Sequence, residues 1–583
     1  MNQTTNTLQF SPGLLAPAIS EELENWQKKN KLQRLWASDS SLWTNQDENK
    51  WTGWLSVPEL ECAELQKIKA LAQELKAAAF TDIVLLGMGG SSLCPAMMAE
   101  TFGKVDDHPR LHILDSTDPS QVRHLDDQLD LKTTFFIVSS KSGSTLEPNL
   151  FKKYFYRRVQ DVVGKTDVGS YFAAITDPNS SLDHLAQKSN FKAIFYGLPS
   201  IGGRYSALSN FGMAPAGLMG IDIKYFLEQA RYMMDLCAQM TSLQDNPGVM
   251  LGIILGVCAK QGKDKLTFIT SPGITALGAW LEQLIAESTG KQGRGIIPVD
   301  QEPLGNLSVY GHDRLFAYIC LTLDPDPEQE RRVIALEKAG QVVVRCNLDN
   351  KLHLGAELFR WELATAVASS ILGVNPFNQP DVEASKVRTM ELMAIHQKTG
   401  KMPQDEPIFS DQGFQLFTDE TNARDLNRHL KGIPSIEAYL RAHLARVCPG
   451  DYVDLSAFIE MSEAHIVLLQ QSRLLIRDAK RVATCLEFGP RFLHSTGQIY
   501  KGGPNTGVFL QITADPDHDI SIPGETYTFG LVLRAQAQAD FEVLAQRSRR
   551  VLRIHLTQDI GAGLRQLYEI LCSLEVQRTL AVF

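Results

Sequence analysis

Two loops in this sequence are rich in glycine and hydroxyl side chains, and each follows an apolar run. The first is GMGGSS at residues 87–92, and the second is SSKSGST at residues 139–145. Glycine lets the backbone approach a ligand closely, while hydroxyls and the N–H groups at a helix start bind anions. The second loop could offer several donors to one phosphate, namely the hydroxyls of Ser140, Ser142, Ser144 and Thr145 and the ammonium of Lys141.

A capped strand-to-helix turn would have a similar composition, so neither loop is diagnostic by itself. The first predicted strand is not followed by GxGxxG, and the chain has no GxxxxGK followed by Ser or Thr. Those patterns mark dinucleotide and nucleoside triphosphate sites. Two loops on neighbouring strands of a parallel sheet instead favour a small phosphorylated ligand, held outside the carboxyl ends of the strands.

Five further side chains could perform acid–base chemistry or hold a polar substrate. Arg204 follows a glycine pair in GGRYSALSNFG, and Gln283 and Glu287 are four residues apart in a helical pattern, hence on one helix face. Lys386 ends GVNPFNQPDVEASK, and His494 precedes a glycine-rich turn in RFLHSTGQIYKGG. Each residue taken singly also fits a structural role, because a lone glutamate is usually solvated and a lone histidine usually packs in the core.

Apolar runs that end in Gly, Ser, Thr or Asp alternate with amphipathic helical patterns from about residue 52 onward. This alternation predicts βαβ units and parallel sheets. The predicted strands form a first series at residues 82–90, 110–117, 133–140 and 170–177, and a second at residues 265–271, 315–324 and 341–348. We therefore expect an α/β fold with two tandem, doubly wound, mainly parallel sheets.

The expected organisation has four segments. They are an N-terminal extension (1–51), a first domain with the phosphate loops (52–228), a second domain with Glu287 and Lys386 (229–400), and a C-terminal segment with His494 (401–583). The last segment starts with a polar connector at residues 400–413 and a helical pattern to about residue 480. It continues with strand-like runs at 507–513, 527–533 and 550–556 and a closing helix near 560–575. We expect it to pack back on the second domain and complete it.

Composition narrows the class of protein. The net charge of −10 and the pI of about 5.8 argue against nucleic acid or an anionic membrane as partner. The nine cysteines have no CxxC pair and no zinc-like spacing with histidine, which is typical of a reduced chain. The start of the chain lacks the pattern of a signal peptide, and its longest apolar run is too short for a membrane span. We expect a cytoplasmic protein.

Six segments together resemble the phosphoglucose isomerase family, which is built from two sugar-isomerase (SIS) domains. They are GMGGSSLCP (87–95), SSKSGSTLEP (139–148), GGRYSALSNFG (202–212), EQLIAESTGK (282–291), GVNPFNQPDVEASK (373–386) and LHSTGQ (493–498). The resemblance covers most of residues 80–390 and resumes near residue 485. It implies reversible isomerisation of glucose 6-phosphate to fructose 6-phosphate in glycolysis and gluconeogenesis, through ring opening and a cis-enediol(ate).

The resemblance also implies roles for individual residues. Substrate-binding roles fall to Gly90 and Ser91 at the sugar-phosphate site, Ser140, Lys141, Ser142 and Thr145 at the phosphate, and Gln283 and Gln379 at the sugar. Glu287 would move the proton between C2 and C1, Arg204 would support the enediolate, and His494 with Lys386 would open the ring.

Aldose–ketose isomerisation requires a base, a cation and a ring-opening group, whether or not the resemblance holds. A carboxylate shielded from water can remove a proton next to a carbonyl and return it to the neighbouring carbon. A guanidinium can stabilise the enediolate because it does not lose its own proton. Histidine titrates in the range that ring opening needs. No step requires a metal or a redox cofactor, so we expect none.

The order of segments departs from the usual family pattern, in which the histidine segment precedes the lysine segment. Here Lys386 precedes His494, as in the isomerase half of bifunctional transaldolase/phosphoglucose isomerase proteins, which suggests a functional link to a transaldolase. A transaldolase barrel of roughly 250 residues does not fit in this chain. Asp381 stands where the family often has glycine. The family implies a homodimer whose histidine comes from the neighbouring subunit, although a moved segment could supply it from its own chain.

Two alternative functions remain open from the sequence. A regulatory SIS protein that senses a phosphosugar would need the phosphate loops but no acid–base set. The joint presence of Glu287, Lys386 and His494 therefore favours the enzyme. An isomerase that also accepts mannose 6-phosphate is equally compatible, because the two substrates differ only in one hydroxyl at C2.

Overall fold

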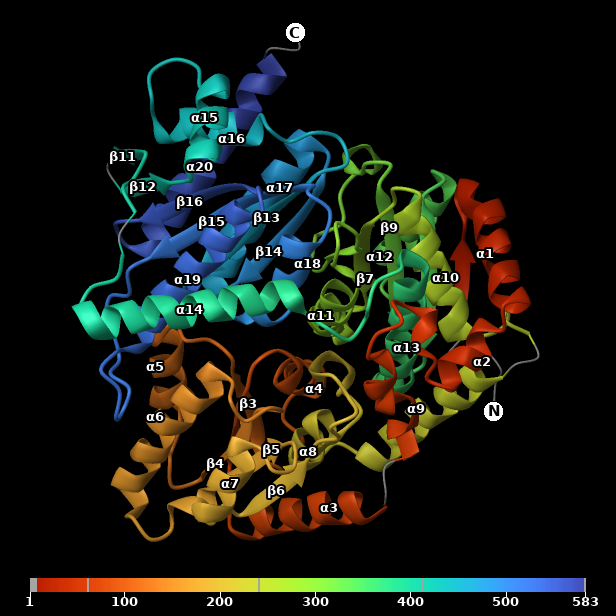
Figure 1. Ribbon diagram of the computed structural model, residues 1–583, viewed down its shortest axis with the longest axis vertical. Helices are drawn as coiled ribbons and strands as arrows, with labels where there is room; N and C mark the ends of the chain where they lie inside the picture. Colours follow the sequence, from red (N-terminus) through yellow and green to blue (C-terminus); the bar gives the residue numbers. More distant parts are fainter. Residues whose placement is uncertain (1–7, 60–61, 240–241, 404, 412, 581–583) are drawn as a thin grey trace.

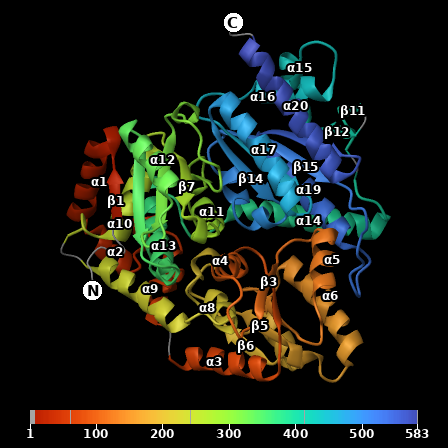
Figure 2. The ribbon, with the colours of Figure 1, turned by 180° about the vertical axis from the view of Figure 1, so that it is seen from behind.

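The structure, a computed structural model, describes residues 8–59, 62–239, 242–403, 405–411 and 413–580. The first seven residues of the expected N-terminal extension therefore lie outside the described residues. Three α/β units, each with its own sheet, adjoin near the middle of the molecule (Figures 1 and 2). No helix in these described ranges combines the length and the apolar character that crossing a membrane would require.

The first unit has a five-stranded, fully parallel sheet in the order β3-β2-β4-β5-β6. Its strands are β2 (Asp82–Leu86), β3 (Arg110–Leu114), β4 (Thr134–Ser139), β5 (Phe172–Thr176) and β6 (Ala193–Tyr196). Its helices are α3 (Cys62–Ala77), α4 (Leu93–Phe102), α5 (Pro119–Gln128), α6 (Leu146–Val163), α7 (Ser181–Lys188) and α8 (Asn210–Leu218). Both glycine-rich loops lie at the carboxyl edge of this sheet, after β2 and β4.

The second unit has a sheet in the order β1-β10-β9-β7-β8, in which only β1, from the N-terminal extension, runs antiparallel. Its strands are β1 (Leu8–Ser11), β7 (Lys265–Thr270), β8 (Ile297–Val299), β9 (Arg314–Leu321) and β10 (Val342–Leu348). Its helices are α1 (Ala16–Lys28), α2 (Lys31–Trp36), α9 (Ile223–Ala238), α10 (Pro247–Lys260), α11 (Leu277–Thr289), α12 (Pro327–Lys338), α13 (Leu354–Leu372) and α14 (Pro380–Thr399). The predicted α/β fold with two tandem, mainly parallel sheets is confirmed.

The third unit has six strands in the order β11-β12-β16-β15-β13-β14, of which β13 to β16 are parallel. Its strands are β11 (Phe409–Asp411), β12 (Phe414–Phe417), β13 (Tyr452–Phe458), β14 (Ala483–Phe488), β15 (Gly507–Ala514) and β16 (Arg550–Leu556). Its helices are α15 (Glu420–His429), α16 (Ile436–Leu444), α17 (Glu463–Lys480), α18 (Gly497–Gly502), α19 (Phe529–Gln546) and α20 (Ile560–Leu580). Within the described part of the chain, these strands pair only with one another.

The C-terminal segment therefore packs back on the second unit, as expected, but as a sheet of its own. Its apolar residues Phe492, Ile499 and Tyr500 share a core with Ala286 of α11 and Ile297 of β8. On another side, residues of α19 and α14 pack with α6 of the first unit in a second core. Figure 1 shows α14 running between the first and third units. The domain boundaries drawn at residues 51, 228 and 400 stay predictions.

Two local predictions in the C-terminal segment are wrong. The run at 527–533 is the start of α19 and not a strand, because the Thr528 hydroxyl accepts a hydrogen bond from the Leu531 N–H and thus caps a helix. The region expected to be helical up to residue 480 contains strand β13, whose seven residues are all buried. Asp454 and Ser456 give this stretch a polar sequence that does not indicate a buried strand. Both side chains nevertheless lie in the core, where they bond each other.

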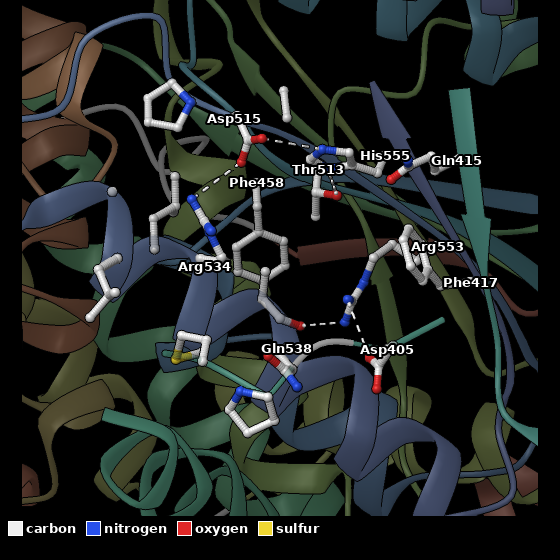
Figure 3. Close-up of a pocket in the computed structure, with 18 of the residues that line it drawn as sticks. Asp405, Gln415, Phe417, Phe458, Thr513, Asp515, Arg534, Gln538, Arg553 and His555 are labelled. Atoms are coloured by element: carbon white, nitrogen blue, oxygen red, sulfur yellow. Dashed lines mark hydrogen bonds and ion pairs between the residues drawn. The ribbon is translucent and has the colours of Figure 1, made fainter. Parts of the chain in front are cut away.

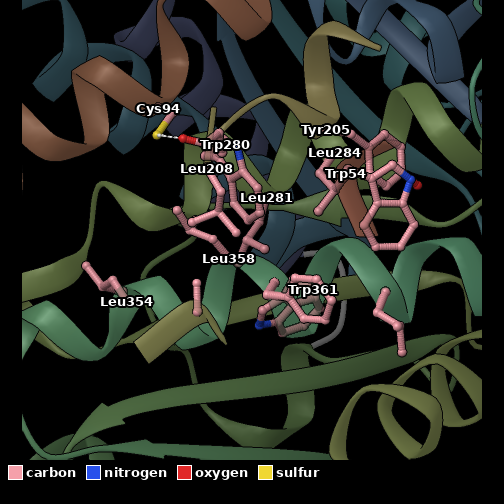
Figure 4. Close-up of a cluster of buried hydrophobic side chains, with 14 of the residues drawn as sticks. Trp54, Cys94, Tyr205, Leu208, Trp280, Leu281, Leu284, Leu354, Leu358 and Trp361 are labelled. Carbon is pink, nitrogen blue, oxygen red and sulfur yellow. Dashed lines mark hydrogen bonds between the residues drawn. The ribbon is translucent and has the colours of Figure 1, made fainter. Parts of the chain in front are cut away.

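A dense core fixes the helix that carries Gln283 and Glu287. The apolar run around residue 250 is the buried helix α10, as expected, and it packs closely on α13. A Cβ atom at Gly252 would lie 2.5 Å from the Cβ of Val367, so the two helices touch through glycine. Trp280 and Leu281 of α11 pack in the same core as Trp361 (Figure 4). This packing sets the height and rotation of α11.

Candidate active site

The residues predicted for catalysis converge where the three units meet. Helix α11, the loop after β2, the start of α14 and the segment η11–α18 of the tail (Arg491–His494 and Gly497–Gly502) adjoin there (Figure 1). The carboxyl edge of the first sheet supplies the glycine-rich loops, and the carboxyl edge of β14 supplies the histidine segment. Segments separated by up to several hundred positions in the sequence thus build one polar cluster.

Arg204 and Glu287 form the centre of this cluster. The distance between the Arg204 Nη1 and the Glu287 Oε1 is 3.1 Å, and the two side chains are 2% and 9% exposed. The guanidinium is also fixed by the carbonyl oxygens of Pro376 and Asn378 and by the Ser288 hydroxyl, at 2.8–3.1 Å. A buried carboxylate is thus held beside a buried guanidinium group.

Gln283 and Gln379 surround this pair, and their contact with a sugar stays a prediction. The Gln283 amide donates to the Glu287 Oε2 at 3.1 Å and to the backbone oxygen of His494 at 2.9 Å. Its Oε1 is buried and has no hydrogen-bond partner in the described part of the chain. The Gln379 Oε1 accepts from the Arg204 Nη1 at 3.2 Å. The unsatisfied Gln283 oxygen can accept a hydrogen bond from a hydroxyl group.

The loop after β2 approaches the other segments through its glycines. A Cβ atom at Gly90 would lie 2.1 Å from the backbone oxygen of Gly203, and one at Gly89 would lie 2.8 Å from the oxygen of His494. Gly89 also has a φ of +55°, a conformation that side chains disfavour. Ser91 is buried in the same turn. The loop therefore brings first-unit backbone against both the Arg204 and the His494 segments.

His494 reaches the cluster from its own chain, where it pairs with a residue that the sequence reasoning missed. The His494 Nε2 lies 3.0 Å from the Glu147 Oε1 across 347 sequence positions. Burial by itself would raise the pKa of the Glu147 carboxyl. The neighbouring His494 ring and, less strongly, the Lys386 ammonium more than offset this, so that its pKa lies below the usual value.

Glu147 is further held by the tail. The Gln536 amide of α19 donates to the Glu147 Oε1 at 2.6 Å, and the Thr117 hydroxyl donates to the Gln536 Oε1 at 2.7 Å. Glu147 belongs to the segment SSKSGSTLEP, and its place in the first turn of α6 suggests only a helix-dipole role. Its burial distinguishes it, and burial at this position could not be read from the local pattern.

Lys386 forms no hydrogen bond or ion pair with His494 or Glu147 in the part of the chain that the structure describes. Its ammonium is 3.6 Å from Glu383 on the same helix, and its side chain is 43% exposed. Its influence on the pKa of Glu147 places it in the electrostatic neighbourhood of the His494–Glu147 pair. The role of Lys386 at the site therefore stays a prediction.

The predicted phosphate loop has hydroxyls available and a lysine that is already engaged. The Ser142 and Ser144 hydroxyls lie 3.0 Å apart and are exposed, and the Ser140 hydroxyl donates to Thr145 at 3.2 Å. The Lys141 ammonium instead contacts both carboxylate oxygens of a single aspartate at 2.6–2.7 Å, and that aspartate is Asp177. A direct contact of Lys141 with phosphate therefore stays a prediction.

Asp381, the departure from the family pattern, ties the start of α14 to the tail. The Gln498 amide donates to the Asp381 Oδ2 at 2.8 Å, while the Asp381 N–H donates to the Gln498 Oε1 at 2.9 Å. Arg547 forms an ion pair with the Asp381 Oδ1 at 2.7 Å. The sequence reasoning missed Gln498 and Arg547, because their partner is far away in the chain.

Comparisons with known proteins agree with this architecture. The family model described as phosphoglucose isomerase matches residues 52–297. A glucose-6-phosphate isomerase of Trichormus variabilis is 27% identical over 424 residues, which cover 62% of this chain and 79% of the relative. A glucose-6-phosphate isomerase of Methanocaldococcus jannaschii is 29% identical over 341 residues, which cover 53% of this chain and 83% of the relative.

Among solved structures, a hypothetical protein of Thermus thermophilus is similar to this chain. It has a TM-score of 0.57 at 24% identity, and the match covers 67% of this chain and all of that protein. Fold and site together define a protein of tandem parallel α/β units with a buried arginine–glutamate pair between them. Over residues 52–297 the chain matches the phosphoglucose isomerase family.

Proposed function

We propose that this protein interconverts glucose 6-phosphate and fructose 6-phosphate, as a step of glycolysis and gluconeogenesis. The observation that carries the proposal is the Glu287 carboxylate, buried between the Arg204 guanidinium and the Gln283 amide at 3.1 Å each. Aldose–ketose isomerisation needs a base that stays close to two adjacent carbons and a cation beside the adjacent oxygens. This arrangement has both, and it is shielded from water.

In this proposal Glu287 takes the proton from C2 of the open-chain aldose and returns it to C1. The proton of the C2 hydroxyl passes to the C1 oxygen, so that C2 becomes the carbonyl carbon. The electron pair of the broken C–H bond forms the double bond of an enediolate, whose negative oxygen lies beside Arg204. The guanidinium is held by backbone oxygens of Pro376 and Asn378 before any substrate binds. It therefore requires little reorganisation when charge develops, which is the main source of electrostatic catalysis.

His494 opens the ring in this proposal, with Glu147 as its partner. When the Nε2–H donates to the Glu147 carboxylate, the neutral ring has its lone pair on Nδ1. That nitrogen can take the proton of the anomeric hydroxyl and deliver a proton to the ring oxygen. Lys386 supplies a mobile cation on the solvent side of the pair, and the hydroxyls of Ser140, Ser142 and Thr145 hold the phosphate.

Replacement of Glu287 by glutamine tests the proposal, because it keeps the shape and removes the base. We expect turnover to fall by roughly 10²-fold or more, while binding of a sugar-acid phosphate analogue is retained. Glu282→Gln is a matched control, because Glu282 is half-buried on the same helix but accepts from the Asp300 backbone N–H. Near-normal turnover of Glu287→Gln would contradict the assignment.

Substrate range is tested by assaying glucose 6-phosphate and mannose 6-phosphate side by side with the purified full chain. Turnover of both would extend the proposal to a dual isomerase. Tight binding of a sugar phosphate without any turnover would favour the phosphosugar-sensing alternative.

We also propose a cytoplasmic homodimer with a functional link to a transaldolase. The homodimer follows from the family, and the link follows from the position of the histidine segment after the lysine segment. The contacts of His494 with Glu147 and Gln283 of its own chain support sites that each subunit completes by itself. Sedimentation equilibrium measures the first claim, and a monomer would contradict it. Copurification with transaldolase activity measures the second.

A further inference from the structure

The third unit contains a cavity of about 910 Å³ that none of the predicted active-site residues lines. Its walls are the end of α14, the connector after it, strand β12, the carboxyl ends of β13, β15 and β16, and the first turns of α19 (Figure 3). Polar and aromatic side chains from these elements point into one space. The cavity is therefore a partly open cleft between several elements and not a groove in a single loop.

Its position in the sheet is one where open α/β sheets bind ligands. The chain passes from β13 through α17 to β14 on one side, and from β15 through α19 to β16 on the other. Neighbouring strands β13 and β15 thus form a topological switch point, outside which a crevice is expected at the carboxyl ends. Phe458, which ends β13, and Ala514, which ends β15, both line the cavity.

Arg553 is a cation at this cavity with little neutralising charge. Its guanidinium lies over the Phe541 ring at 4.3 Å, and its Nε donates to the Gln511 Oε1 at 2.8 Å. Among the described residues, its ion-pair partner is Asp405 at 3.9 Å, and the Asp405 side chain is 42% exposed. Burial, offset only partly by Asp405 and more distant carboxylates, lowers the pKa of Arg553 to about 10. An anion in the cavity would offset this burial.

Two further permanent cations, Arg534 and Lys401, also line the cavity. Arg534 contacts Asp515 at 3.3 Å, and the His555 ring lies 3.7 Å from the same carboxylate (Figure 3). Lys401 is exposed on the connector and forms no ion pair with any residue that the structure describes. The three permanent cations Lys401, Arg534 and Arg553 therefore face two carboxylates, those of Asp405 and Asp515.

The helix end at the cavity does not bind the anion itself. The Gly530 N–H at the start of α19 donates to Asp519 at 2.8 Å, and the Leu531 N–H donates to the Thr528 hydroxyl at 3.2 Å. An anion would thus be held by side chains. Guanidinium groups suit this task, because their planar donors match phosphate oxygens.

We propose that this cavity binds a small phosphorylated polyhydroxy compound at a site separate from the catalytic one. Arg553, Arg534 and Lys401 would hold the phosphate group, and the side chains of Gln415, Gln538 and Thr513 would bond the hydroxyls. Helix α14 connects the two sites, because Lys386 and His396 are separated by ten residues, or roughly 15 Å of helix. Occupation of the cavity would therefore act on the helix that carries Lys386.

The test is a calorimetric titration of the full chain with inorganic phosphate and, separately, with glycerol 3-phosphate. Both probes are expected to occupy two classes of site in the wild type. The double variant Arg534→Ala/Lys401→Ala should weaken one class by roughly ten-fold or more. Its isomerase activity without added phosphate should remain at the wild-type level, because neither residue touches the candidate active site. The control Arg424→Ala/Lys398→Ala removes the same charges outside the cavity and should bind like the wild type.

Equal affinity of the double variant and the wild type for both classes would overturn the proposal. A single class of phosphate site that is lost in Thr145→Ala would overturn it too. Arg553→Gln is a second variant, which changes the most buried cation of the cavity. Its thermal unfolding shows whether the variant is folded. The outcome is independent of the proposed isomerase activity, because binding to the cavity is measured without turnover.

Discussion

Glu147 shows how one buried carboxylate can organise a residue from a distant part of the chain. It accepts from Gln536 of α19 and contacts the His494 ring, so it joins the first unit to two segments of the tail. In the proposed mechanism it selects which ring nitrogen carries the proton. Its role is that of a positioning residue, since it acts through His494 rather than on the sugar.

We expect Glu147→Gln to slow ring opening more than proton transfer between carbons. The neutral amide no longer stabilises a protonated His494, so turnover of cyclic glucose 6-phosphate should fall by roughly 10²-fold. Turnover of an aldose phosphate too short to close a pyranose ring should change much less. Glu525→Gln is the control, because Glu525 also joins the tail to the first unit, through Lys153. Equal losses on both substrates would contradict the positioning role.

The same carboxylate predicts a pH dependence of stability. Because the folded-state pKa of Glu147 is below its usual value, ionised Glu147 stabilises the fold at pH values above the unfolded pKa of about 4.3. This contribution is lost as the pH falls through the folded-state pKa. The gap in unfolding free energy between the wild type and Glu147→Gln should thus be full near pH 6 and shrink below about pH 4. Urea midpoints measured over this range check it, and a gap that widens toward acid would contradict it.

At the scale of elements, the loop after β2 acts as a spacer between two units. Gly89 adopts a positive φ and leaves no room for a Cβ atom beside the backbone oxygen of His494. The short helix α18 follows the histidine segment directly and is buried over its whole length. Rigid loops on both sides therefore set the distance between α11 and the histidine segment.

Gly89→Ala should consequently damage both stability and turnover. Alanine would be strained in the left-handed backbone conformation, and its Cβ atom would lie 2.8 Å from the His494 oxygen. Because these two costs add, we expect a loss of about 2–4 kcal/mol of unfolding free energy. Gly103→Ala is the matched control, because Gly103 also has a positive φ but nothing lies within 4 Å of its Cβ position. Thermal unfolding and steady-state rates measure both variants. Similar behaviour of the two would show that backbone strain alone, and not the contact, matters.

For the whole molecule, short-range patterns were sufficient to predict the pairing of Gln283 with Glu287 on one helix face and most strands of the first two sheets. They missed the short strands β1, β6 and β8. Contacts such as His494 with Glu147 and Asp381 with Gln498 could not be predicted, because they join positions 347 and 117 residues apart. Strand β13 escaped detection because Asp454 and Ser456 give its sequence a polar character, although both side chains lie in the core and bond each other. Lys141 illustrates the same limit, since its partner Asp177 comes from the end of a different strand.

The position of the polar connector has a consequence for how the polypeptide could be divided. Residues 401, 403 and 405–407 are exposed, while the third unit has its own sheet and is tied to the others by Arg388–Glu542, Asp381–Arg547 and shared apolar cores. Two separately made fragments, one ending and one beginning within the connector, should therefore complement each other as a split enzyme.

We expect residues 1–405 and 406–583 to be inactive alone and to regain most of the activity when coexpressed. The measurement is the isomerase turnover of the copurified pair. Asp381→Ala in the first fragment should weaken this reassembly, whereas the surface change Lys398→Ala should not. In such a two-piece protein, activity would depend on assembly, because Glu287 and Lys386 lie in the first fragment and His494 lies in the second.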